Sequence, residues 1–367
     1  MNRFFALSCA LVLLLKSGFA QSGHLPKPPQ LPVHKATLLQ TFPIVGATGM
    51  AFVPGKSQLV LVADTLQFWD YRSGKRLKNV VVQEFPVLQN LQVGRRGEFV
   101  TVLCFSDPDR DLGGSALAFW NLKAQKWGRI QKAPPGTDTD FAAFALSPDG
   151  KTLATSQLST ATHDFRAEKQ KSGRVRLWNA KNGRLLKTLA RGRFYNLEWS
   201  PDGKFLVGAG ERDAVLWNWR SGKQTRLQNA GAWALSFSPD GKHLATIGRD
   251  SADFGGAVRL FETVSGRLIK NLPLPWSDMG DVLFSRDGKT LWVGGGAGEN
   301  HDTKGRTLDM ARGEVLFVSV KDLKVQARFL TEGGEVSNLA LSDDGKTLAT
   351  VQYGDNKSGG VKTWRLP

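Results

Sequence analysis

The chain has 367 residues, a formal net charge of +16 at pH 7, 41% hydrophobic residues and two cysteines. That length allows one large domain or two smaller ones with a sizeable core, and the positive charge favours anionic partners. Cys9 falls in a predicted leader, so Cys104 would stand alone, which excludes an intrachain disulfide framework in the exported chain.

Residues 1–20 predict a secretory signal peptide. Arg3 precedes an apolar run over 4–15, and small residues surround Ala20, where we expect cleavage. The run is too short to span a bilayer, and no later run is long enough, so we expect a periplasmic or secreted protein without a membrane span. Cleavage removes two basic residues and leaves a net charge of +14. Residues 21–34 contain four prolines and predict an extended linker.

A short pattern then recurs seven times: an apolar segment, a turn related to Ser-Pro-Asp-Gly-Lys, and a second β-forming segment. The copies begin at Phe52, Val93, Leu146, Trp199, Phe237, Phe284 and Leu341. Proline presets φ at the first corner, aspartate bonds the backbone ahead of it, and glycine accepts positive φ. Each copy therefore predicts a strand, a tight turn and a strand.

A second recurring piece follows in most copies, as in "LQFWDYRSGKRLKNV" over 66–80. It predicts a strand ending in an aromatic residue, a polar turn and a further strand. Four strands in each of seven repeats predict an all-β fold, a seven-bladed β-propeller of four-stranded antiparallel blades over residues 35–367. The last copy ends after its third strand, whereas Lys35–Phe42 has no blade of its own, so we expect this N-terminal strand to close the ring.

These residues resemble the WD-repeat family of β-propellers in its bacterial exported form. Trp69-Asp70 is the one intact Trp-Asp pair, and the family's Gly-His pair is absent from every repeat. The resemblance implies a platform for protein interactions, although a repeat of this kind specifies architecture more than function. A weaker similarity to periplasmic lactonase-like and quinoprotein-like propellers implies an enzyme with its site at the top of the channel.

The strand order implied by the resemblance places the Ser-Pro-Asp-Gly turns on one face, the bottom, and the longer connections on the top. Loops elaborated on one face predict a binding surface, although loop lengths also drift without function. Aromatic residues beside arginines suit stacking on a sugar or base, whereas their simpler role is to cover the core. The top-face candidates are Arg191, Arg193, Tyr195, Trp233, Trp276, Asp278, His163 and His301.

Strand alternation points a set of polar residues into the central channel: Asn90, Asn196, Glu198, Asp281 and Asn338. Among these, Asn196, Glu198 and Asp281 are where we would look for acid–base chemistry, because a buried carboxylate can have a raised pKa. A polar channel without catalysis is the favoured interpretation. The sequence contains no nucleophile-elbow, phosphate-loop or dinucleotide motif.

The segment with Asp107, Asp109 and Asp111 spaces three carboxylates two residues apart, as at the start of a calcium-binding loop. Leu112 replaces the usual glycine, and the twelfth position carries no acid, so the pattern favours a solvated acidic loop over a Ca²⁺ site. We expect no other cofactor.

The favoured function is an exported, monomeric, non-catalytic binding or scaffold module whose top loops contact a protein partner in the cell envelope or outside the cell. One alternative is a propeller hydrolase or lactonase-like enzyme. Another is an anion-binding protein that holds a polysaccharide or nucleic acid through a basic bottom face, because eleven basic residues fall in third-to-fourth strand turns. These are Arg72, Lys75, Lys123, Lys126, Lys181, Arg184, Arg220, Lys223, Arg267, Lys321 and Lys324.

Overall fold

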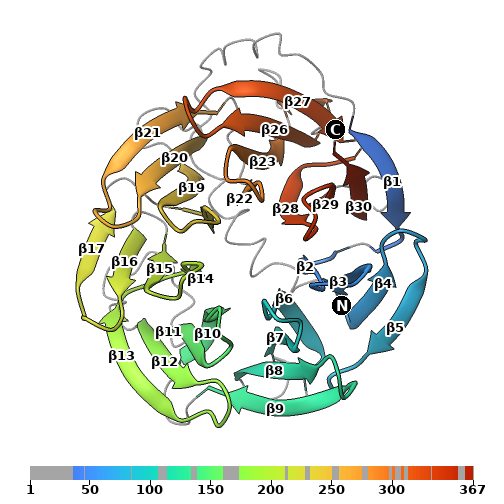
Figure 1. Ribbon diagram of the computed structural model, residues 1–367. Helices are drawn as coiled ribbons and strands as arrows, with labels where there is room; N and C mark the ends of the chain where they lie inside the picture. The colour runs from blue at the N-terminus through green and yellow to red at the C-terminus, as the bar shows by residue number, and fades with distance from the viewer. Residues whose placement is uncertain are drawn as a thin grey trace.

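Seven four-stranded antiparallel sheets surround a central axis in the computed structural model (Figure 1), which confirms the predicted all-β propeller. None of the described residues forms a helix that could cross a membrane. The structure describes residues 36–44, 46–83, 85–105, 114–133, 139–159, 173–210, 214–227, 232–249, 256–274, 280–296, 300–301, 307–309, 313–331, 333–353 and 360–366.

Each blade is a meander whose first strand is innermost. Blade 1 contains β2 (Gly49–Phe52), β3 (Gln58–Val62), β4 (Leu66–Asp70) and β5 (Arg76–Val80). Blade 2 contains β6 (Val87–Val93), β7 (Phe99–Phe105), β8 (Ser115–Asn121) and β9 (Lys126–Lys132). Blade 3 contains β10 (Thr139–Leu146), β11 (Thr152–Ser159), β12 (Arg174–Asn179) and β13 (Leu185–Arg191). Blade 4 contains β14 (Asn196–Trp199), β15 (Phe205–Ala209), β16 (Ala214–Asn218) and β17 (Gln224–Leu227).

The remaining blades follow the same plan, with one insertion. Blade 5 contains β18 (Ala234–Phe237), β19 (His243–Arg249), β20 (Gly256–Glu262) and β21 (Leu268–Pro273). Blade 6 contains β22 (Asp281–Phe284), β23 (Thr290–Gly296), β26 (Gly313–Ser319) and β27 (Val325–Thr331). Between β23 and β26, β24 (Asn300–His301) and β25 (Thr307–Asp309) form a separate two-stranded sheet that the sequence did not predict. Blade 7 contains β28 (Val336–Leu341), β29 (Thr347–Gln352), β30 (Gly360–Arg365) and β1 (Thr37–Phe42).

Strand β1 closes the ring as the outer strand of blade 7. It pairs antiparallel with β30, so that Thr37 lies opposite Arg365 and Phe42 opposite Val361. The Phe42 ring is buried and meets the Trp69 ring of blade 1 edge to face, with 5.5 Å between the centroids. The predicted closure by an N-terminal strand is therefore confirmed.

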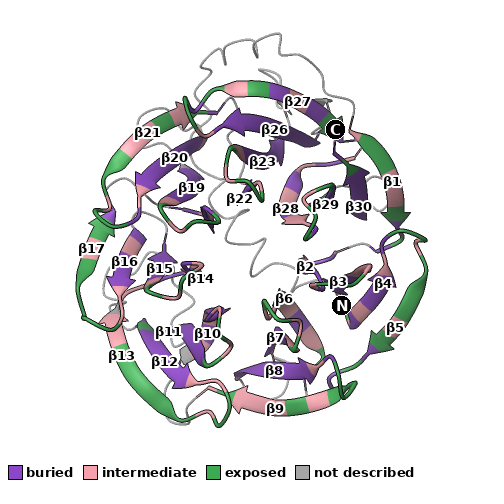
Figure 2. Cartoon of the chain, in the orientation of Figure 1, coloured by how far each residue is buried: buried purple, intermediate pink, exposed green. Residues whose placement is uncertain are grey.

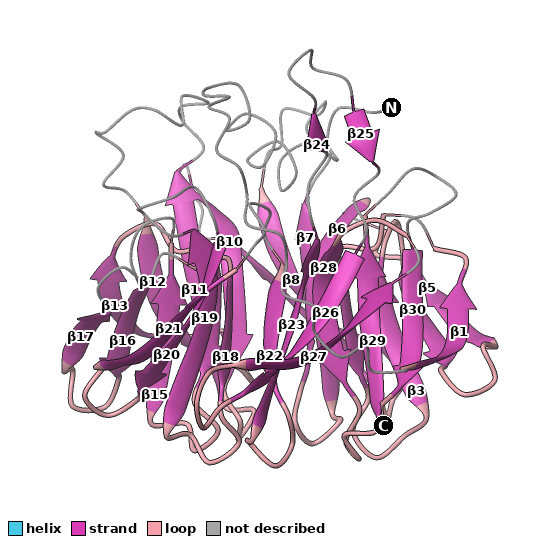
Figure 3. Cartoon of the chain, turned by 90° about the horizontal axis from the view of Figure 1, so that it is seen from above, coloured by secondary structure: helices cyan, strands magenta, loops and turns pink. Residues whose placement is uncertain are grey.

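The repeated turns lie together at one end of the propeller, here called the bottom face (lower edge of Figure 3). In blade 5, Gly241 has φ 72°, and the Asp240 carboxylate accepts hydrogen bonds from the Ser238 hydroxyl at 2.7 Å and the Lys242 N–H at 3.0 Å. The turns also touch one another around the axis: the Gly55 N–H of blade 1 donates to the Asp343 carboxylate of blade 7 at 2.7 Å.

The core lies between neighbouring blades, because both faces of an inner strand are covered. Blades 1 and 2, for example, share one apolar cluster that includes Val60, Phe68, Leu88, Val102 and Trp120. Figure 2 shows mainly buried inner strands, and exposed residues concentrated on the outermost strand of each blade. Tryptophans such as Trp120 are thus packing residues between blades.

Outer strands also reach sideways to the next blade through long polar side chains. Each of four such side chains donates a hydrogen bond to a backbone carbonyl in the third-to-fourth strand turn that follows around the ring. The pairs are Gln40 to Arg72 at 2.9 Å, Arg129 to Ala180 at 3.0 Å, Lys187 to Trp219 at 3.2 Å and Lys270 to Lys321 at 3.0 Å. We call these four contacts the outer hooks.

Candidate site in the central channel and at its mouths

The innermost strands carry side chains that bind the next blade. These strands are sheet edges, so some of their backbone N–H groups need a partner outside their own sheet. Three side chains, each one residue before the end of its strand, accept a hydrogen bond from such an N–H. The pairs are Gln92 with Leu146 at 2.6 Å, Glu198 with Phe237 at 3.2 Å, and Ser236 with Phe284 at 3.2 Å.

Asp281 makes the corresponding link from blade 6 to blade 7. Its two carboxylate oxygens accept the N–H groups of Val282 and Leu339, both at 2.8 Å. Burial raises the pKa of Asp281 to about 6, although the two N–H groups oppose the shift. We call Gln92, Glu198, Ser236 and Asp281 the inner latches.

Glu198 is the most perturbed acid of the channel. Burial raises its pKa to about 8, and the negative charge of Asp281 adds to this, whereas the Phe237 N–H and the positive charge of Arg95 oppose it. Glu198 is therefore mainly protonated at neutral pH, and its hydroxyl is a donor while its other oxygen accepts from the backbone.

Two arginines stand at the bottom mouth of the channel, in turns where most repeats have proline. Arg95 follows β6. Burial lowers the pKa of Arg95, the negative charge of Glu198 opposes this shift, and the positive charge of Arg286 adds to it. Arg286 follows β22 and donates to the carbonyls of Leu341 at 2.8 Å and Ser342 at 3.1 Å. Sequence reasoning missed both, although replacement of the turn proline was a usable signal.

At the top mouth, the structure brings together Arg193, Tyr195, Asn196 and Trp233. The Arg193 guanidinium lies over the Tyr195 ring, 5.8 Å from its centroid. The Asn196 amide donates a hydrogen bond to the Trp233 carbonyl, which joins blades 4 and 5. Arg193, Tyr195 and Trp233 are only partly buried, so this group offers an arginine and two aromatic rings beside the channel.

Several predicted site residues lie outside the described residues: His163, Trp276, Asp278 and the aspartates Asp107, Asp109 and Asp111. Arg191 ends β13 and His301 ends β24, but their side chains are also outside the described part. Within the described residues, no three His, Cys, Asp or Glu side chains are grouped as metal ligands. The calcium site stays a prediction.

The two remaining channel asparagines differ from each other. Asn90 is exposed at a bulge of β6, where its φ is 50°, a left-handed conformation that asparagine tolerates better than most residues. Asn338 is half-buried on β28 and accepts a hydrogen bond from the Ser337 hydroxyl at 3.4 Å. Within the described part of the chain, neither makes a hydrogen bond to the next blade of the kind made by the inner latches.

Comparison with models of known protein families gives no match, and comparison with curated proteins gives none either.

Proposed function

We propose that this protein is an exported, WD-repeat-like binding module that recognises a protein partner through its top face without catalysing a reaction. The observation that carries the proposal is the unequal length of the connections between strands. The connection between the second and third strands spans residues 160–173 in blade 3 and residues 297–312 in blade 6, whereas the turns of the bottom face are short. Loops on a rigid scaffold commonly carry recognition.

The described part of the top face has suitable chemistry for a protein partner. Arginine and aromatic side chains dominate the energetics of many interfaces, because they bury large areas and make directed contacts. Arg193, Tyr195 and Trp233 supply these residue types on two adjacent blades. Export follows from the predicted signal peptide over residues 1–20.

Site-directed photo-crosslinking in the producing cell tests the proposal. A photoreactive phenylalanine analogue would replace Arg193 on the top face and, as a matched control, Lys181 in an exposed bottom turn. We expect one envelope or extracellular protein to crosslink from position 193 and not from position 181. Shortening Ser159–Ser172 and Ala297–Arg312 should abolish that product. Crosslinking from position 181 alone would instead favour the basic bottom face.

A hydrolase is the second candidate, favoured by the raised pKa values of Glu198 and Asp281. Against it, the hydrogen bonds of both carboxylates hold neighbouring blades together, which is a structural role. A panel of lactones and esters would be assayed with the wild type and Glu198→Gln. Turnover that disappears in Glu198→Gln, while the melting temperature is kept, would replace the binding proposal with an enzyme.

A further inference from the structure

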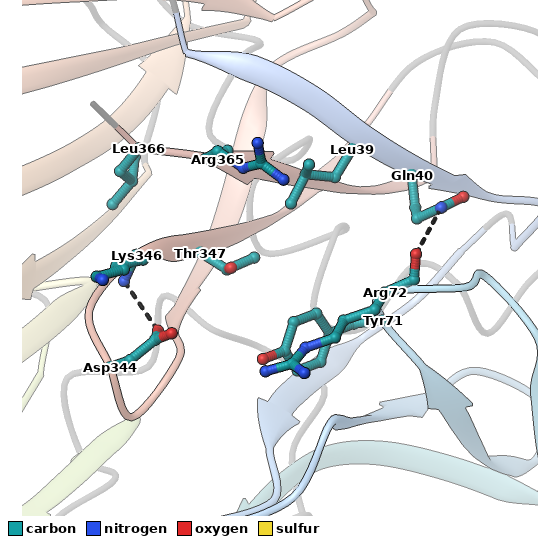
Figure 4. A pocket seen from close by; sticks show the side chains of 9 residues that line it. All are labelled: Leu39, Gln40, Tyr71, Arg72, Asp344, Lys346, Thr347, Arg365 and Leu366. Atoms are coloured by element: carbon teal, nitrogen blue, oxygen red, sulfur yellow. Dashed lines mark hydrogen bonds between the residues drawn. The ribbon is translucent and has the colours of Figure 1, made fainter.

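A pocket of about 410 Å³ opens at the closure seam, where blade 7 meets blade 1 on the bottom face. Its walls come from β1, the ends of β30 and the β28–β29 turn on one side, and from the β4–β5 turn on the other. Figure 4 shows the Arg72, Lys346 and Arg365 side chains around this space. We call it the seam pocket.

The charges around the seam pocket are unbalanced. Within the described residues, Arg72, Lys346 and Arg365 form no ion pair, and Asp344 is the single acid of the lining. The Asp344 carboxylate is already engaged, because it accepts the Ser342 hydroxyl at 2.6 Å and the Lys346 N–H at 3.0 Å. Three positive charges and one negative charge leave an excess of two positive charges among the residues that line the pocket.

The floor of the seam pocket consists of packed, mainly apolar side chains, whereas its rim is exposed to solvent. Tyr71 and Leu366 are 6% and 8% exposed, and Tyr71 packs edge to face on Phe52 with 4.9 Å between the ring centroids. The three basic side chains are exposed, and the Arg72 guanidinium lies over the Tyr71 ring at 5.8 Å from its centroid. A ligand with a negatively charged end and a flat apolar body would match both the basic rim and the apolar floor.

We propose that the seam pocket binds a small phosphomonoester with an aryl- or sugar-sized body. A phosphate dianion matches the excess of two charges, which a single carboxylate does not, and guanidinium groups pair with phosphate oxygens through two parallel N–H donors. The body would lie on Tyr71 and Leu366. The pocket volume is within the range of small-molecule sites.

Isothermal titration of the purified protein at low salt with phenyl phosphate, inorganic phosphate and phenol tests this. We expect phenyl phosphate to bind more tightly than inorganic phosphate, and phenol to show no binding. Arg72→Gln and Arg365→Gln should each weaken phenyl phosphate about tenfold or more, the scale of a lost charge-assisted hydrogen bond. Both side chains are exposed, so unchanged melting curves are expected.

Arg220→Gln is the matched control. Arg220 occupies the Arg72 position in the turn of blade 4 and lies over Trp219 at 5.2 Å, but it is not part of the seam pocket. The Arg220→Gln variant should bind phenyl phosphate as tightly as the wild type does. If Arg220→Gln weakens binding as much as Arg365→Gln, the attraction is general surface charge and the proposal fails. Equal affinity for phenol and phenyl phosphate, or no heat with any ligand, would overturn it as well.

Discussion

Equivalent threonines in the second strands of different blades have different surroundings, depending on the aromatic residue of the adjacent third strand. In blade 3 the Trp178 indole N–H donates to the Thr155 hydroxyl at 2.8 Å, and in blade 7 Trp364 donates to Thr350 at 3.0 Å. Blade 5 carries Phe261 where blade 3 carries Trp178, so the matching Thr246 hydroxyl loses its donor. Thr246 is fully buried, and its hydroxyl has no partner among the described residues.

This difference predicts opposite outcomes for the same substitution. Thr155→Val should lower the free energy of unfolding by about 1–3 kcal/mol, because it leaves a buried indole N–H without an acceptor. Thr246→Val should be neutral or stabilising, since it removes an unpaired hydroxyl and keeps the shape of the side chain. Denaturant unfolding of both variants measures the two changes in the free energy of unfolding. Equal losses in the two variants would contradict the role assigned to the hydrogen bond between Trp178 and Thr155.

At the scale of the strand, β1 matters because it completes a sheet that the C-terminal segment leaves one strand short. It contributes an antiparallel ladder with β30, interrupted by a register shift between Leu38 and Gln40, and the buried Phe42 ring. Of its two leucines, Leu38 is 43% exposed and Leu39 is only partly buried, so the strand binds the propeller mainly through its backbone and one aromatic anchor.

A chain that begins at Pro43 should therefore melt at a markedly lower temperature than the full protein. Loss of the Phe42 ring alone corresponds to about 3–5 kcal/mol. A synthetic peptide of residues 36–42 should restore the melting temperature in a concentration-dependent way, because it binds only the folded state. The same peptide with Phe42→Ala is the control and should restore much less. A truncated chain that melts like the full protein would contradict the role of β1.

Most strands could be predicted because their signals are local. Each Pro-Asp-Gly turn marks its own two strands, and the isolated segment at Lys35–Phe42 matched the missing one. The inner latches could not be predicted in the same way. Glu198 binds the backbone of Phe237, and a backbone N–H leaves no trace in a sequence. Alternation correctly identified Glu198 and Asp281 as polar residues of the inner strands, but not what they hold.

Across the whole molecule, ionisable groups make the stability of the fold depend on pH in opposite directions. The turn aspartates Asp240, Asp287 and Asp344 have pKa values lowered by the serine hydroxyl and the lysine N–H of their own turns. Their stabilisation is present above the unfolded pKa and is lost as pH falls through the folded pKa. Glu198 acts in the other direction, because its folded pKa of about 8 lies above its unfolded value.

Stability should thus be greatest in weak acid and should fall as pH rises toward 8, while the folded state holds a proton on Glu198 that the unfolded chain has released. Asp281, with a folded pKa of about 6, contributes to the same fall at lower pH. Glu198→Gln removes the part that Glu198 contributes and keeps an acceptor for the Phe237 N–H. Each pKa unit corresponds to about 1.4 kcal/mol, and solvent screening reduces the effect at this partly exposed side chain, so we expect a gain of about 1–3 kcal/mol at pH 9 and little change at pH 5. Urea unfolding of the wild type and the variant at both pH values measures this. A variant that loses as much stability as the wild type between pH 5 and pH 9 would contradict the prediction.

The antiparallel pairing of β1 with β30 also determines how the ring would respond to tension. Thr37 and Arg365 face each other at one end of the ladder, so a load applied at residues 36 and 366 would act on that end alone. The cross-strand hydrogen bonds would then break in succession instead of sharing the load. The propeller should open at low force by peeling of β1, while the blades between the two ends remain folded at that stage.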